Sequence, residues 1–317
     1  MSHNSSATTL SPPVVSTPTS TGILWGLLGV AAFSLTVPLT RVAVEGLSPL
    51  FIGAGRAVVA AILAALALAV TRQPFPRGIQ WLRLAVTAGG IVAGFPLLTT
   101  FALTSTSASH GAVVIALLPA ATATVAVIRG RERPRLLFWV LTALGVIAAL
   151  VFAFLQSGGF GSLHWADLLL LGAVVAAAIG YAEGGLLARE LGAWQTISWA
   201  LVVALPAMIV LTIISVGPGI QSATPVQWAS FAYLGVVSMF LGFFAWYRGL
   251  AIGPMAQVSQ IQLVQPVMTI AWAALLLGES LTWTTAAGGL VVILCAGAAV
   301  RVRLNPPSNI KPSTINS

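Results

Sequence analysis

A row of glutamines stands in the long apolar stretch between Gly253 and Gly289. At about 100° per residue, Gln257, Gln260 and Gln265 fall on one face of a helix, whereas Gln262 lies further round. An amide donates and accepts hydrogen bonds without a charge, and it is costly to expose to lipid. We therefore expect the three side chains to line a cavity and contact a substrate, with hydrogen bonding between helices as the alternative.

Two prolines occupy the same place in the two halves of the chain. Pro119 and Pro266 are 147 residues apart, as are Glu132 and Glu279. A proline in a helix removes one backbone donor, so the carbonyl groups four residues earlier are predicted to lose their partners and to face substrate or water. The alternative is a kink whose freed carbonyl groups bond to neighbouring helices. Those carbonyl groups belong to Ile115 and Gln262.

Glu183 is the one acidic residue well inside an apolar segment, in the sequence IGYAEGGLLARE. A carboxylate within a membrane helix indicates a functional site. Glu183 could bind a substrate amine or take up a proton, and Tyr181 beside it could form an aromatic cavity wall. Alternatively, Glu183 is the partner of an arginine, with Arg189 and Arg248 as candidates.

Two further polar residues lie within or at the start of apolar segments. Arg56 could hold a substrate carboxylate in a bidentate pair, or it could be a structural residue that bonds backbone carbonyl groups or Glu45. His110 stands 147 residues before Gln257 and titrates near neutral pH, so it is a candidate cavity residue and protonation site. The alternative for His110 is a structural hydrogen bond at a helix end.

The composition identifies the elements that must hold these residues. The chain has 317 residues, of which 58% are hydrophobic and 6% are charged. A soluble domain has about 25% charged residues. The apolar runs are continuous and about 20 residues long, which is typical of membrane helices and not of the alternating strands of a barrel. The net charge of +8 does not indicate nucleic acid, because the basic residues lie in short loops.

Ten membrane spans are predicted, and the basic residues set their orientation. With the N-terminus in the cytoplasm, twelve of the fourteen basic residues fall in loops on that side or in the C-terminal tail, as the positive-inside rule requires. We expect a multi-pass protein of the cell membrane with both termini cytoplasmic, and with tails at 1–21 and 302–317. The spans are 22–43, 49–70, 82–103, 106–128, 136–156, 166–187, 193–215, 226–249, 254–277 and 282–301.

Five spans in each half imply two repeats of opposite orientation, 22–156 and 166–301. The loop around Glu132 is rich in arginine, whereas the loop around Glu279 has no basic residue, as an inverted pair requires. Inverted repeats place a substrate site at their interface and allow it to open to each side in turn.

The chain resembles the EamA-type members of the drug/metabolite transporter superfamily over residues 22–301. The resemblance rests on Arg56, Pro119 and Glu132 in the first half, and on Pro266, Gly278-Glu279 and Gly288 in the second. It implies ten helices in two five-helix repeats. It also implies a central cavity lined by the first, third, fourth, sixth, eighth and ninth spans, and the export or exchange of small metabolites such as amino acids.

The predicted function is therefore secondary transport by alternating access, with export of an amino acid or a related small metabolite. An uncoupled facilitator or exchanger is the first alternative, and proton coupling and a homodimer are left open. A membrane-embedded enzyme is the second alternative. It is disfavoured because the six acidic residues lie mostly in loops and no metal-ligand cluster, phosphate loop or catalytic triad is visible. We expect no cofactor, no metal and no nucleic-acid partner.

Overall fold

The computed structural model describes residues 19–130, 135–157, 165–216 and 222–278, with the single positions 283, 290, 291, 294 and 298. Within these residues all regular structure is helical. A continuous apolar chain in lipid must satisfy its backbone groups internally, and a helix does so within one segment. The predicted class, an all-α polytopic membrane protein, is confirmed. The predicted tenth span, 282–301, and both tails lie outside the fully described ranges.

The helices follow the predicted spans closely, although several spans are divided into shorter pieces. The first half contains α1 (Thr19–Ser34), α2 (Thr36–Ala43), α3 (Pro49–Val70), α4 (Ile79–Thr87), η1 (Ala88–Gly94), α5 (Phe95–Ala102), α6 (Ala108–Ile115), α7 (Leu118–Gly130) and α8 (Leu136–Ser157). The second half contains α9 (Trp165–Leu191), α10 (Ala193–Ile214), α11 (Pro225–Tyr233), η3 (Leu234–Leu241), α12 (Gly242–Ile252), α13 (Met255–Ser259), η4 (Gln260–Val264) and α14 (Gln265–Leu277).

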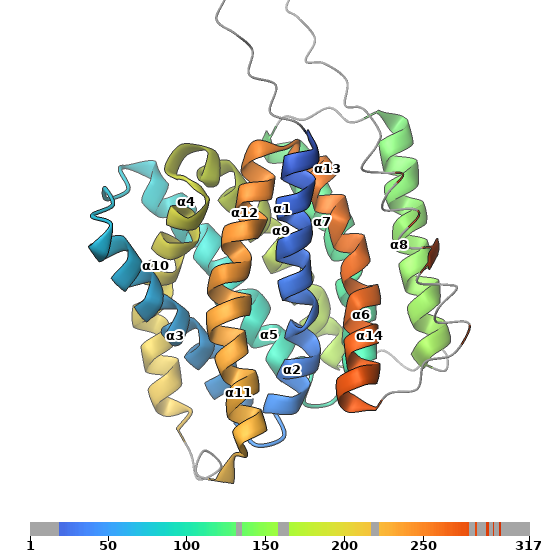
Figure 1. The fold of residues 1–317 in the computed structure, drawn as a ribbon, viewed down its shortest axis with the longest axis horizontal. Helices are drawn as coiled ribbons and strands as arrows, with labels where there is room; N and C mark the ends of the chain where they lie inside the picture. Colours follow the sequence, from blue (N-terminus) through green and yellow to red (C-terminus); the bar gives the residue numbers. More distant parts are fainter. Residues whose placement is uncertain are drawn as a thin grey trace, which may run out of the picture.

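Seven helical stretches in the described part of the chain are long and apolar enough to cross a membrane. They are Ser20–Ala43, Pro49–Val70, Ile79–Ala102, Trp165–Leu191, Ala193–Ile214, Pro225–Ile252 and Met255–Leu277. The stretches Leu118–Arg129 and Leu136–Ala148 are shorter apolar helices. In Figure 1, α1 stands near the middle beside α12, and α8 stands at the edge of the bundle, where it contacts α6, α7 and η4.

Two spans contain a π-helical segment at the same place in the two halves. η1 divides the span that begins with α4, and η3 divides the span that begins with α11. The residues that lie 147 positions after Ala88 and Gly94 are Gly235 and Leu241, so the two segments coincide almost residue for residue. A π-helical turn inside an α-helix disrupts the regular ladder of hydrogen bonds and often marks a functional site.

Two other interrupted helices cross in the core. Ala116, between α6 and α7, and Leu263, in the 3₁₀ segment η4, are both fully buried and pack in one cluster. α7 packs against α13 and η4, whereas α6 packs against α14, so the two interrupted helices run antiparallel. Ala116 and Leu263 are also 147 residues apart. Residues in matching positions of the two halves therefore meet at the crossing.

The prolines begin helices instead of bending them. Pro119 and Pro266 are the second residues of α7 and α14, where a missing N–H leaves no hydrogen bond unmade. The prediction for the Gln262 carbonyl is wrong, because this carbonyl accepts a hydrogen bond from the backbone N–H of Gln265. The interruption of the helix has already occurred in η4, before the proline is reached.

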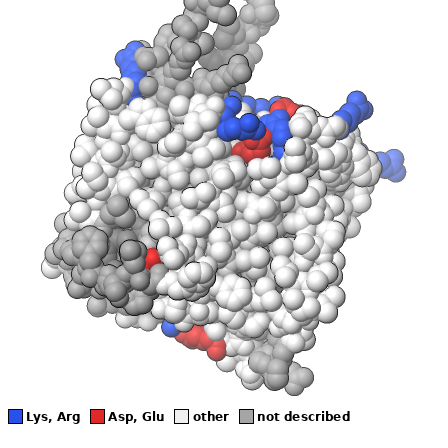
Figure 2. Space-filling model, turned by 180° about the vertical axis from the view of Figure 1, so that it is seen from behind, with Lys and Arg blue, Asp and Glu red and all other residues white. Residues whose placement is uncertain are grey.

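The charged residues gather at the two ends of the bundle. Figure 2 shows a broad white belt of uncharged residues between a large group of charged residues at one end and a smaller group at the other. Most of the described arginines collect at the end where α3, α7, α9 and α12 finish, whereas Arg41 lies at the opposite end and Arg56 is buried inside the bundle. We refer to the first end as the basic end. The arginines there are Arg72, Arg77, Arg83, Arg129, Arg135, Arg189 and Arg248.

Candidate functional site

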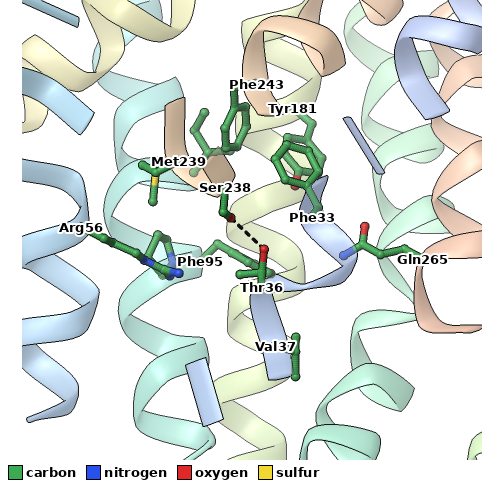
Figure 3. Close-up of a pocket in the computed structure, with 12 residues that line it drawn as sticks. Phe33, Thr36, Val37, Arg56, Phe95, Tyr181, Ser238, Met239, Phe243 and Gln265 are labelled. Atoms are coloured by element: carbon green, nitrogen blue, oxygen red, sulfur yellow. Dashed lines mark hydrogen bonds between the residues drawn. The ribbon is translucent and has the colours of Figure 1, made fainter. Parts of the chain in front are cut away.

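A small cavity lies in the centre of the bundle, where helices from both halves meet (Figure 3). Its volume is about 20 Å³, which is enough for about one water molecule. A metabolite fits only if the helices around it separate. The lining residues are Phe33, Thr36, Val37, Arg56, Ile91, Phe95, Pro96, Tyr181, Ser238, Met239, Phe243 and Gln265.

One side of this central cavity is polar. The hydroxyl groups of Thr36 in α2 and Ser238 in η3 form a hydrogen bond of 2.7 Å across the two halves. Both side chains are buried, and Figure 3 shows this pair between Arg56 and Gln265. Within the described chain, the Gln265 amide has no hydrogen-bond partner, so it is available to a molecule in the cavity.

The other side of the central cavity is aromatic. The ring centroids of Phe33 and Phe243 are 4.9 Å apart, and Tyr181 lies 6.4 Å from Phe33 and 5.9 Å from Phe243. The fully buried Trp246 packs behind Phe33 and Tyr181, with its centroid 5.4 Å from that of Tyr181. The predicted aromatic wall thus includes Tyr181, and three interlocked rings give it a fixed shape.

Arg56 is almost completely buried, with 1% of its surface exposed, and it borders the central cavity from α3. Its Nε atom has no hydrogen-bond partner, and the side chain forms no salt bridge with any described residue. Glu45, the predicted partner, lies exposed in the loop between α2 and α3. A buried cation without a counter-charge is costly, so its place in the lining requires an explanation.

Glu183 lies in a cluster of charges near the basic end. One of its oxygens accepts a hydrogen bond from Nε of Arg83 in α4, and the other accepts one of 3.0 Å from Nε of Arg129 in α7. Arg83 also pairs with Glu190, which lies about two helical turns beyond Glu183 on α9. The predicted alternative partners, Arg189 and Arg248, are therefore not the partners of Glu183. Instead, Arg189 donates to the carbonyl groups of Leu250 and Gly253.

A second, larger pocket opens beside this cluster. It has a volume of about 580 Å³ and lies between α4, α7 and α9. Arg83, Arg129 and Glu183 form its polar part. Its apolar walls are Ile79, Leu82, Val86, Val125, Ile128 and Ile179. We call it the basic-end pocket.

The glutamines are divided among different environments. Gln265 lines the central cavity, whereas Gln260 is completely buried and neither of its amide atoms has a partner among the described residues. Gln262 is buried in the same way. Gln257 is buried in α13. The expected stripe depends on 100° per residue, but η4 winds with about three residues per turn, so the side chains after it point elsewhere.

The remaining predicted residues lie outside the cavity lining, or their side chains are not among those that the structure describes. His110 belongs to α6, but its side chain is outside the described residues. Pro119 and Pro266 are buried beside the crossing of the interrupted helices. Residues that sequence reasoning missed are Thr36, Ser238 and the phenylalanines of the lining. Hydroxyl groups and phenylalanines occur throughout the chain, so no pattern in the sequence distinguishes these.

Long apolar helices around a buried cavity with one polar and one aromatic side define a multi-pass α-helical membrane protein with an internal cavity. The chain belongs to the EamA-like transporter family, whose model matches residues 20–154 and again residues 164–300. The predicted resemblance to the drug/metabolite transporter superfamily is thereby confirmed. The protein is a membrane transporter in class, and family membership favours this class over an enzyme.

Two individual proteins illustrate the similarity. The chain is 42% identical over 291 residues to an uncharacterized transporter, YdeK, of Bacillus subtilis (strain 168), which covers 89% of this chain and 98% of YdeK. A solved structure described only as "Crystal structure of protein" shares 16% identity with a TM-score of 0.71, over 88% of this chain and 96% of that one. At this identity the second similarity shows the fold alone.

Proposed function

We propose that this protein is a secondary transporter that exports a small metabolite, such as an amino acid or a related compound, across the cell membrane by alternating access. The observation that carries the proposal is the antiparallel crossing of two interrupted helices at Ala116 and Leu263. Matching residues of two repeats can touch in an antiparallel crossing only near the two-fold axis that relates the repeats. An inverted repeat is the architecture that alternating access uses.

Further contacts support two inverted repeats over 22–156 and 166–301. The pair η1 and η3 occupies matching positions, and the packing of α1 on α12 has its counterpart in the packing of α9 on η1 and α5. α3 and α10 are the second spans of the two halves, so their close contact is preserved when the two repeats are exchanged. The family model also matches the chain twice, over nearly the same ranges. Together with the tenth span that the sequence predicts at 282–301, these observations support the proposal of ten helices.

The two pockets support a cycle in which the centre opens to one side at a time. The central cavity is too small for a metabolite, and the basic-end pocket reaches α9 only two residues beyond Tyr181, at Glu183. The pairs of Glu183 with Arg83 and Arg129 join α4, α9 and α7, so breaking them would let these helices separate. We propose that Glu183 acts in this closure. We propose that the basic end faces the cytoplasm, as the positive-inside rule favours, and that both termini lie on that side.

The remaining predicted residues take supporting roles in this proposal. Gln260 and Gln262 hold unpaired amides next to the crossing, and these amides would gain partners when water or substrate enters. Gln257, His110, Pro119 and Pro266 belong to the same two interrupted helices. An uncoupled facilitator or exchanger stays the competing function, and collapsing the pH gradient across proteoliposomes distinguishes it from proton-coupled export.

The test is untargeted metabolite profiling of culture medium. Cells that produce the native protein are compared with cells that produce Glu183→Gln at a matched membrane level, and with an empty-vector control. We expect one metabolite class to accumulate outside only with the native protein. Identical media in all three cultures would contradict export of a resident metabolite, and uptake of added compounds would then be measured with the same strains.

A further inference from the structure

The described lining of the central cavity carries one positive charge and no negative one. Arg56 is the single charged residue in its described lining, and it is buried with no carboxylate partner in the described chain. The nearest carboxylate along α9 is Glu183, which is already engaged by two arginines outside the cavity. A charge in a low-dielectric interior is costly without a counter-charge, and a negatively charged molecule in the central cavity would supply one.

We propose that Arg56 binds the carboxylate of the transported molecule and that this molecule carries a net charge of −1. A guanidinium presents parallel N–H donors that match the two oxygens of a carboxylate. The inference rests on the proposed transport function and narrows its substrate class. An ordinary zwitterionic amino acid leaves the Arg56 charge uncompensated, because its own amine cancels its carboxylate. A monocarboxylic acid without a free amine balances the charge.

The other residues of the lining indicate which chemical groups the substrate carries besides its carboxylate. Thr36 and Ser238 lie between Arg56 and Gln265 in Figure 3, and together with Gln265 they provide neutral donors and acceptors, which suits a hydroxyl, oxo or amide group. Phe33, Tyr181 and Phe243 form the opposite, apolar side, which suits an aromatic or branched aliphatic group. The expected substrate is a small amphipathic monocarboxylate, for example an oxo, hydroxy or N-acyl acid with an apolar side chain.

The cavity can enlarge because its walls include both π-helical segments. Ile91 of η1 and Ser238 and Met239 of η3 border it. A π-helical turn that reverts to α-helix shifts the register of the residues around it. Such a change on both sides would widen the central cavity without breaking the packing of α1 on α12.

The inference is tested by direct binding with three probes that share one skeleton. Purified protein in detergent is titrated at about pH 6 with 3-phenylpropanoate, L-phenylalanine and L-phenylalanine amide, whose net charges at this pH are −1, 0 and +1. We expect 3-phenylpropanoate to bind at least tenfold more tightly than the other two. Tighter binding of the zwitterion or the cation would overturn the inference, as would the absence of binding by all three. The metabolite profiling described above tests export independently of this inference, because it requires no assumption about the charge of the substrate.

Variants of Arg56 separate a binding residue from a structural one. Arg56→Met should keep or raise the thermal stability, since it removes an unpaired buried charge, and should weaken 3-phenylpropanoate binding about tenfold or more. Arg56→Lys should weaken 3-phenylpropanoate binding less than Arg56→Met does, because lysine keeps the charge without the bidentate geometry. The matched control is Arg248→Met, an exposed arginine of α12, which should bind like the native protein. A large loss of stability in Arg56→Met with unchanged probe affinity in Arg56→Lys would show that Arg56 holds the fold instead.

Discussion

Tyr181 and Glu183 stand two residues apart on α9 and face different pockets. Tyr181 lines the central cavity, and Glu183 lines the basic-end pocket, where Arg83 and Arg129 hold it. Side chains two residues apart on a helix point in nearly opposite directions, so one turn of α9 takes part in both pockets. Any rotation of α9 that changes the aromatic wall must therefore also change the ion pairs.

The first prediction concerns this cluster of charges. Glu183→Gln leaves Arg83 and Arg129 without their shared carboxylate, and we expect both lower thermal stability and a large loss of transport. The stability loss should be about 1–3 kcal/mol, below the cost of breaking a fully buried pair, because both arginines reach solvent. Thermal unfolding in detergent and transport at several pH values measure the two effects.

The control for that variant is Glu190→Gln. Glu190 also pairs with Arg83, but 44% of its side-chain surface is exposed. Exposed pairs contribute about 0–1 kcal/mol, so this change should have little effect on either measurement. Native transport by Glu183→Gln at every pH would remove Glu183 from the mechanism.

The second prediction concerns the hydroxyl pair across the two halves. Thr36→Val and Ser238→Ala each remove one partner of the 2.7 Å hydrogen bond, and each should lower transport while costing about 0.5–1.5 kcal/mol of stability. The double variant should cost less than the sum of the two single variants, because neither group is then left without its partner. Strict additivity in a double-mutant cycle would show that the two hydroxyl groups do not interact.

The third prediction concerns the contact of α1 with α12. A Cβ atom at Gly29 would lie 2.9 Å from Cβ of Trp246 and 3.0 Å from its backbone, so the helices must move apart to accept a side chain. Gly29→Val should cost about 1–3 kcal/mol by overpacking. Gly89→Ala is the control, because a Cβ there has no atom within 4 Å. Equal melting temperatures for the two variants would contradict this packing.

The fourth prediction concerns topology. Cys295 is the single cysteine of the chain, so Cys295→Ala gives a background for labelling. In that background, Thr104→Cys should react with a membrane-impermeant maleimide in intact cells, whereas Thr71→Cys should react only after permeabilisation. Both positions are exposed, and they lie at opposite ends of the bundle. The reverse labelling pattern would show that the basic end faces outward.

The sequence predicted the helical spans well because long apolar runs have one stable form in lipid. It also predicted the places where two helices are interrupted, since Pro119 and Pro266 each begin the helix after the interruption. The resemblance to the family was confirmed. These successes all depend on local composition or on spacing along the chain.

The site was harder to predict because it depends on distant contacts. Arg83 and Arg129 are 100 and 54 residues from Glu183 in sequence, and the positive-inside rule by itself accounts for their presence near the ends of spans. The π-helical segments η1 and η3 change which side chains face the centre, and so does the 3₁₀ segment η4. A calculation with a constant angle per residue therefore placed Gln260 with Gln265, although they occupy different environments.

The central claim is that one cavity opens to each side of the membrane in turn. Ser238→Cys in the Cys295→Ala background places a thiol in the central cavity, and a small charged methanethiosulfonate reagent can be supplied to right-side-out or to inside-out vesicles. We predict that the thiol reacts from both sides in separate experiments, and that saturating substrate changes the two rates in opposite directions. Reaction from one side alone, with substrate leaving that rate unchanged, would contradict alternating access at this cavity.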